Sequence, residues 1–97
     1  MKQRIDEIIV EWDTAKDNLN IKKHGLCFKT AALVFADKNR VELYDFKHSA
    51  KEDRFMVIGL VNNLITVVYT ERVDALRIIS ARVATEAERR IYYEQNS

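Results

Sequence analysis

The chain has 97 residues, of which 47% are hydrophobic and 32% are charged. This length allows one domain and no second hydrophobic core, and the composition is that of an ordinary soluble globular protein. A formal net charge of +1 excludes a polybasic nucleic-acid-coating module, and no apolar run is long enough to span a bilayer. A single cysteine, Cys27, and the lack of an N-terminal apolar signal segment indicate a cytoplasmic protein without disulfides.

The first part of the chain predicts one strand followed by two helices. Residues 7–12 are rich in β-branched residues and predict the strand. Asp13 is suited to cap the N-terminus of a helix, and Gly25 is suited to the left-handed residue that follows its end. Residues 28–35 place Phe and Ala at i, i+3, i+4 and i+7, which predicts a second helix with only Cys27 at its weak N-cap.

Four strands are predicted next, at residues 41–46, 54–60, 64–70 and 75–83. Asn62-Asn63 favours a two-residue hairpin loop. In that register Val61 faces Leu64, and Arg54 faces Glu71 at the open end of the hairpin. The following connection is expected at Val73-Asp74.

A last helix is predicted to begin at Thr85, which forms a T-x-x-E capping box with Glu88. Ala84, Ala87 and Ile91 are expected on its inner face. The element order is β-α-α-β-β-β-β-α within one domain, residues 1–97. Closely spaced strands usually pair with their neighbours in sequence, so we expect an α+β fold: a single antiparallel sheet meander with helices packed on one side.

Arginine recurs every five residues in the stretch 69–85, at Arg72, Arg77 and Arg82. Side chains alternate between the faces of a strand, so Arg77 and Arg82 should point to opposite faces unless a bulge intervenes. An unpaired charge within an apolar strand is costly, which suggests that Arg77 binds a partner or an anion.

Several kinds of chemistry find no support in the residues. His24 and His48 are far apart in sequence, and no C-x-x-C or H-x-x-x-H spacing is present, so no metal and no cofactor is expected. No glycine-rich loop could hold a phosphate. Cys27 could act as a nucleophile with His24, but a half-buried small hydrophobic residue is the favoured interpretation.

The remaining charged residues suit metal-free RNA cleavage. In that reaction a base activates the 2′-OH, an acid protonates the leaving 5′-oxygen, and cations stabilise the developing charge on the phosphate. Arginine is well suited to the last role because its planar charge is permanent. A set of solvated surface ion pairs is the competing interpretation for each residue taken alone.

Five motifs, W-D-x-x-K, K-H-G, H-S, E-x-R-F and R-I-I-S-A-R, give the chain a clear likeness over about residues 10–94. Together they resemble the BrnT family, toxins of type II toxin–antitoxin modules with a RelE-like ribonuclease fold. The resemblance implies a metal-independent endoribonuclease that inhibits translation. It also implies a BrnA-like ribbon-helix-helix antitoxin in a complex of two toxins and two antitoxins, with operator DNA contacted only through the antitoxin.

The resemblance marks eight candidate site residues, Lys22 beside the K-H-G motif is a ninth candidate, and their roles are hypotheses. The candidates for catalysis are His24, Arg54, Glu71, Arg72 and Arg77, with the arginines on the scissile phosphate and His24 or Glu71 as base or acid. The candidates for RNA binding are Lys22, Lys23, Glu52 and Arg82. Val73 and Cys27 depart from the residues usual in the family.

Two other functions are weighed against the toxin. One is a non-catalytic RelE-like module that binds protein or RNA, although the basic motif residues remain in this chain. The other is a DNA-binding regulator acting alone, which is disfavoured because no predicted helix is strongly basic.

Overall fold

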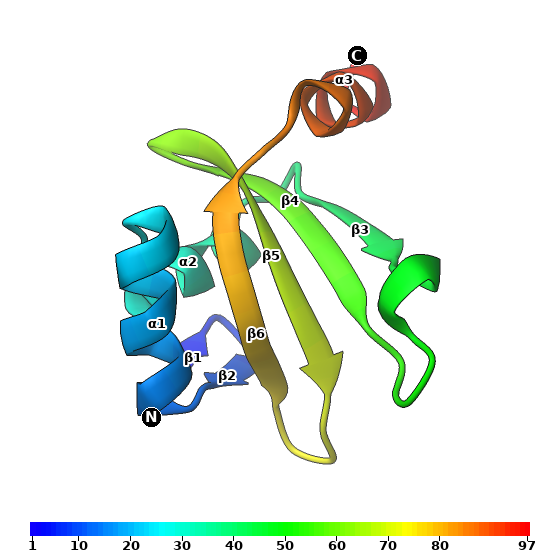
Figure 1. The fold of residues 1–97 in the computed structure, drawn as a ribbon. Helices are drawn as coiled ribbons and strands as arrows, with labels where there is room; N and C mark the ends of the chain where they lie inside the picture. The colour runs from blue at the N-terminus through cyan, green and yellow to red at the C-terminus, as the bar shows by residue number, and fades with distance from the viewer.

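In the computed structural model, which describes residues 1–97, six strands form one sheet in the order β1-β2-β6-β5-β4-β3 (Figure 1). The strands are β1 Lys2–Ile5, β2 Ile8–Glu11, β3 Val41–Tyr44, β4 Phe55–Val61, β5 Asn63–Glu71 and β6 Leu76–Val83. The helices are α1 Thr14–His24, α2 Phe28–Ala31 and α3 Glu86–Gln95, with 3-10 turns η1 Ala32–Ala36 and η2 Phe46–His48. None of the helices is long and apolar enough to cross a membrane.

The α+β class is confirmed, but the prediction of a purely antiparallel sheet is wrong. Strands β3 to β6 pair antiparallel with their neighbours, whereas β2 pairs parallel with β6 and places Glu11 opposite Arg77. Strand β1 was not predicted and forms a hairpin with β2. Its only buried residue is Ile5, so residues 2–5 lack the apolar alternation that marks a strand.

Helices lie on both faces of the sheet, and the prediction that they cover one side is wrong. Alternation along β4 turns Val57 into the main core, with Phe28 and Phe35 of α2 and η1, and turns Ile58 to the other face. There Ile58 packs with Tyr92 of α3. Helix α3 covers only the end of this second face (Figure 1), which we call the open face.

The capping predictions are confirmed, and one detail of α3 is corrected. Asp13 caps α1 and Gly25 follows its end with a left-handed φ of 67°. Thr85 and Glu88 form the expected capping box. Ala87, however, is exposed, and the buried residues of α3 are Glu88 and Tyr92, whose larger side chains reach the sheet.

The β4–β5 hairpin differs by one residue from the predicted register. Asn62 alone takes a positive φ, 62°, so Val61 pairs with Asn63 instead of Leu64. A slip of one residue exchanges the faces of a strand. Met56 therefore pairs with Val68 on the open face, and the pair predicted between Arg54 and Glu71 does not form.

A β-bulge in β6 changes the positions of the arginines. The register shifts between Val68 and Tyr69, which pair with Ser80 and Ile78, so Ile79 is the extra residue. As a result Ile78 and Ala81, three apart in sequence, both face the main core. Arg77 and Arg82 consequently lie on the same open face, and the expectation that they face opposite sides is wrong.

Asn20 joins α1 to the sheet. Beyond Arg77, β6 has no strand partner on the side of β2, and α1 lies beside it there. The Asn20 side chain accepts from the Ala81 N–H at 3.1 Å and donates to the Ala81 carbonyl at 2.9 Å. It thus replaces a neighbouring strand and fixes α1 beside the open face.

Asn20→Ala is expected to lower the free energy of unfolding by about 2–4 kcal/mol, because it leaves a buried N–H and a buried carbonyl without partners. Urea denaturation measures the change. Asn18→Ala is the matched control, since Asn18 is exposed on the same helix. Equal destabilisation by the two substitutions would contradict the role given to Asn20.

Candidate functional site

Three adjoining hollows form one cleft along the open face. The first, about 800 Å³, lies between α1 and β6; the second and third, about 450 and 400 Å³, extend toward the segment before β4. The first and second share Ser80 and Arg82, and the second and third share His48 and Arg54. Because neighbouring hollows share walls, we treat them as a single site and call it the cleft.

Cations dominate the walls of the cleft. The cationic or protonatable side chains that line it are Lys16, Lys22, Lys23, His24, Lys47, His48, Lys51, Arg54 and Arg82. Only two carboxylates, those of Asp45 and Glu52, line it as well. On a chain of net charge +1 this is a strong local concentration of positive charge, and it suits a polyanion.

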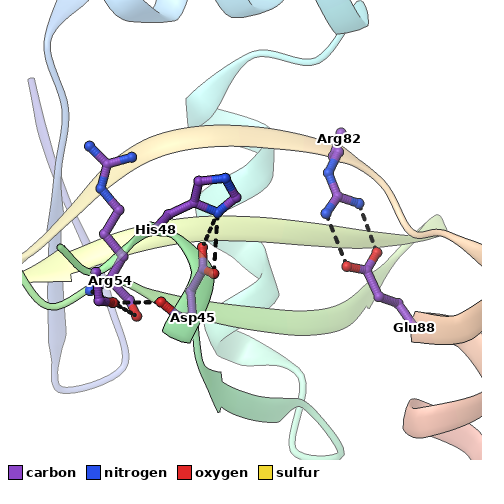
Figure 2. A network of polar contacts seen from close by, with 6 residues as sticks. Asp45, His48, Arg54, Arg82 and Glu88 are labelled. Carbon is purple, nitrogen blue, oxygen red and sulfur yellow. Dashed lines mark hydrogen bonds and ion pairs between the residues drawn. The ribbon is translucent and has the colours of Figure 1, made fainter.

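His48 is held by a buried carboxylate. Its Nδ1 lies 3.0 Å from Oδ2 and 3.2 Å from Oδ1 of Asp45, whose side chain is only 8% exposed, whereas that of His48 is 58% exposed (Figure 2). A carboxylate at Nδ1 favours the proton on that nitrogen and leaves Nε2 with its lone pair. The ring is therefore oriented as a base within reach of solvent and ligands.

The backbone around this pair is braced. Ser49 Oγ donates to the Asp45 carbonyl at 2.5 Å and accepts from the Arg54 N–H at 3.0 Å. The Asp45 N–H donates in turn to the Arg54 carbonyl at 2.8 Å. These contacts fold residues 45–54 back on themselves, so His48 and Arg54 line the same hollow although they are six positions apart in sequence.

Arg54 has no acidic partner. No carboxylate lies within 4.0 Å of its guanidinium, and its buried Nε has no hydrogen-bond partner. Buried donors are nearly always paired in folded proteins, so an unpaired one at the wall of a cationic cleft suggests a ligand. The guanidinium is well placed to bind an anionic oxygen beside His48 (Figure 2).

Arg82, at the other side of the cleft, is clamped by Glu88 of α3. Nη1 and Nη2 bind the two carboxylate oxygens at 2.7 and 3.0 Å (Figure 2). Glu88 also accepts from Thr66 Oγ1 at 2.9 Å and from the Thr85 N–H at 2.8 Å. Burial raises the pKa of Glu88, but these hydrogen bonds and the charge of Arg82 outweigh it and lower the pKa to about 2.

The low pKa of Glu88 predicts acid sensitivity. The folded chain holds this carboxylate ionised to about pH 2, whereas the ordinary pKa is 4.5, so the pair stabilises the fold fully above pH 4.5. As the pH falls from 4.5 toward 2, about 2–3 kcal/mol of stability should be lost. Urea denaturation at successive pH values measures this loss. In Glu88→Gln the free energy of unfolding should depend less on pH between 4.5 and 2. An unchanged slope would contradict the assignment.

Six of the nine residues predicted for the site line the cleft: Lys22, Lys23, His24, Glu52, Arg54 and Arg82. Three line none of its hollows: Glu71, Arg72 and Arg77. Arg77 Nε donates to Glu11 at 2.8 Å, and Arg72 lies 3.5 Å from Glu52. Glu71 is exposed at the end of β5.

Several residues of the cleft are absent from the sequence prediction, among them Asp45, His48 and Ser80. Asp45 and His48 have the i, i+3 spacing of a short turn, and His48 belongs to the H-S motif, so a signal for them existed in the sequence. Ser80 faces the cleft next to the bulge at Ile79, and no local pattern marks that bulge.

The fold and the cleft define a small α+β protein with a cationic groove and an oriented histidine. Residues 12–88 match the model of a family described as the ribonuclease toxin BrnT of type II toxin–antitoxin systems. The chain belongs to this family, and the resemblance seen in its motifs is confirmed. No group of three or more His, Cys, Asp or Glu side chains is placed to hold a metal ion.

A solved structure also supports membership in the BrnT family. The 1.1 Å crystal structure of the Brucella abortus ribonuclease toxin BrnT shares 30% sequence identity with this chain, and the TM-score is 0.60. The match covers 79% of this chain and 96% of the Brucella chain. A search of curated proteins gave no match.

Proposed function

We propose that the chain is a metal-independent endoribonuclease that acts as a toxin by cleaving RNA and so inhibiting translation, with the cleft as its active site. The observation that carries this proposal is the His48–Asp45 pair beside the unpaired guanidinium of Arg54. An oriented base next to a free cation is what cleavage at a 2′-OH requires. Membership in a family of ribonuclease toxins supports the same reaction.

In the proposed reaction His48 Nε2 takes the proton of the 2′-OH. The 2′-oxygen then forms a bond to the adjacent phosphorus while the bond from phosphorus to the 5′-oxygen breaks. Arg54 binds the non-bridging oxygens and stabilises their charge. His24, which lines the adjoining hollow beside α1, gives a proton to the leaving 5′-oxygen, so that the products are a 2′,3′-cyclic phosphate and a 5′-hydroxyl.

The remaining candidates take supporting roles in this proposal. Lys22, Lys23 and Arg82 contact phosphates of the bound RNA from the α1 side of the cleft. Arg72 pairs with Glu52 and Arg77 pairs with Glu11, and neither arginine lines the cleft. The sequence-based hypothesis that Arg72 and Arg77 grip the scissile phosphate therefore gives way to Arg54 alone.

The family resemblance extends the proposal to the fold and the partner. Residues 1–97 form one toxin domain of RelE-like fold, acting in the cytoplasm. A BrnA-like ribbon-helix-helix antitoxin neutralises it in a complex of two toxins and two antitoxins, and only the antitoxin contacts operator DNA. Co-expression with the product of an adjacent gene for such a protein, followed by a molar-mass measurement of the purified complex, tests this part.

Induced expression in bacteria tests the toxin function. The wild-type chain is expected to stop growth and degrade cellular RNA, whereas Arg54→Ala at the same soluble level is expected to do neither. Arg90→Ala, which changes an exposed arginine of α3 outside the cleft, is the matched control. Undisturbed growth and intact RNA with soluble wild-type protein would refute the proposal.

A further inference from the structure

The centre of the cleft has an apolar floor, formed by Met56, Val68 and Ile79. All three side chains are only partly buried, although they lie in the middle of the sheet. Helix α3 covers the open face only around Ile58 and Leu64, so it leaves this floor uncovered. Apolar surface of this kind, inside a polar groove, usually marks a binding site.

Cations stand on both sides of the apolar floor. Arg54 and His48 line the hollow from the β4 side. Arg82 lines it from the β6 side, where this hollow joins the one beside α1. Ser80 is the only uncharged polar side chain, apart from a neutral histidine, that lines the same hollow. A ligand that fits this arrangement has an apolar face and an anionic group at each end.

We propose that the apolar floor is a nucleobase subsite for single-stranded RNA. The flat face of one base packs on the side chains of the apolar floor, and Ser80 Oγ forms a hydrogen bond with the edge of the base. The two phosphates that flank the base contact the cations on either side of the floor. Bases of a duplex are stacked and cannot reach such a floor, so the subsite selects unpaired RNA. This inference rests on the proposed ribonuclease function and names its substrate.

The bulge in β6 is essential to this subsite. Without the extra residue, regular alternation would turn Ile79 and Ser80 to opposite faces, and the cleft would lose one of them. With it, both side chains line the hollow. The same bulge puts Arg82 on the open face together with Arg77, so one backbone irregularity assembles both the floor and a cationic flank.

Binding of small probes tests the subsite without any cleavage. Calorimetry on the wild-type chain compares four nucleoside 3′,5′-bisphosphates with ribose 3,5-bisphosphate, which carries the same phosphates and no base. Because the base removes apolar surface from water, we expect the tightest nucleoside probe to bind at least about tenfold more tightly than the ribose probe. In methyl NMR spectra the nucleoside probes should shift the signals of Met56, Val68 and Ile79, and the ribose probe should not.

Two variants locate the effect. Met56→Ala is expected to reduce the tenfold preference to about threefold or less while leaving the affinity for ribose bisphosphate unchanged. Leu60→Ala is the matched control, because Leu60 lies on the same strand, is exposed and does not line the cleft. Ser80→Ala should narrow the differences in affinity among the four bases.

The outcomes separate this inference from the proposed function. Equal binding of nucleoside and ribose bisphosphates, or a preference that Met56→Ala and Leu60→Ala alter equally, would overturn the subsite even if the chain cleaves RNA. A base preference that Met56→Ala removes would support the subsite even if cleavage failed. Binding of neither probe would also overturn it, because the cationic flanks would then hold no phosphate.

Discussion

His48→Ala is expected to reduce kcat/KM for single-stranded RNA by about 10²- to 10⁴-fold, the usual contribution of a general base. The ring is mostly exposed, but its loss leaves the buried Asp45 carboxylate without a hydrogen-bond partner, so the free energy of unfolding should also fall, by about 1–3 kcal/mol. Cleavage of a fluorescent oligonucleotide, together with urea denaturation, measures both quantities.

Two further substitutions sharpen the test of His48. Asp45→Asn keeps the shape of the buried side chain but weakens the hold on the ring, and should also lower kcat by more than about tenfold. Phe46→Ala is the control, because Phe46 lies in the same 3-10 turn, is exposed and does not line the cleft. Full activity of His48→Ala would contradict its role as the base. Equal losses of activity in all three variants would show that the turn matters only for folding.

Arg82→Ala should lower the free energy of unfolding. It leaves the Glu88 carboxylate mostly buried without its cation, and we expect a loss of about 2–3 kcal/mol, reduced from the value for a fully buried pair because Arg82 is about one-third exposed. Arg82→Lys should recover only part of this loss, since an ammonium group cannot bind both carboxylate oxygens as the planar guanidinium does.

The Arg82–Glu88 ion pair also predicts that the stability lost on removing Arg82 depends on whether Glu88 is present. In the double variant Arg82→Ala/Glu88→Ala no unpaired charge remains, so the combined loss should be smaller than the sum of the two single losses. Urea denaturation of the four proteins gives this coupling. Arg90→Ala serves as the control for removing an arginine, and additive effects at positions 82 and 88 would contradict the clamp.

Local signals predicted the helices well because their cause is local. Asp13, Gly25 and Thr85 act through hydrogen bonds or backbone conformation within a turn of the helix end, so the residue type alone is informative. The sheet was harder to predict. Whether Asn62 or Asn62-Asn63 makes the hairpin loop, and whether β6 bulges at Ile79, depends on packing from both faces, which no short stretch of sequence encodes.

The same limit explains the partial prediction of the site. Lys22, Lys23 and His24 were identified as one end of a helix, and the structure places that end beside the cleft. The sequence does not show that Arg77 is paired, because its partner, Glu11, comes from a parallel strand 66 residues earlier in sequence. Nor does the sequence show that His48 is oriented by a carboxylate, because Asp45 meets the ring only where residues 45–54 fold back on themselves.

The most direct test of the central claim is to identify the RNA ends that the purified chain produces in the presence of EDTA. If His48 and Arg54 cleave RNA by attack of the 2′-OH without a metal ion, mass spectrometry will find 2′,3′-cyclic phosphates and 5′-hydroxyls, and His48→Ala will produce almost none. Fragments that carry 5′-phosphates and 3′-hydroxyls, or cleavage that EDTA abolishes, would contradict the account.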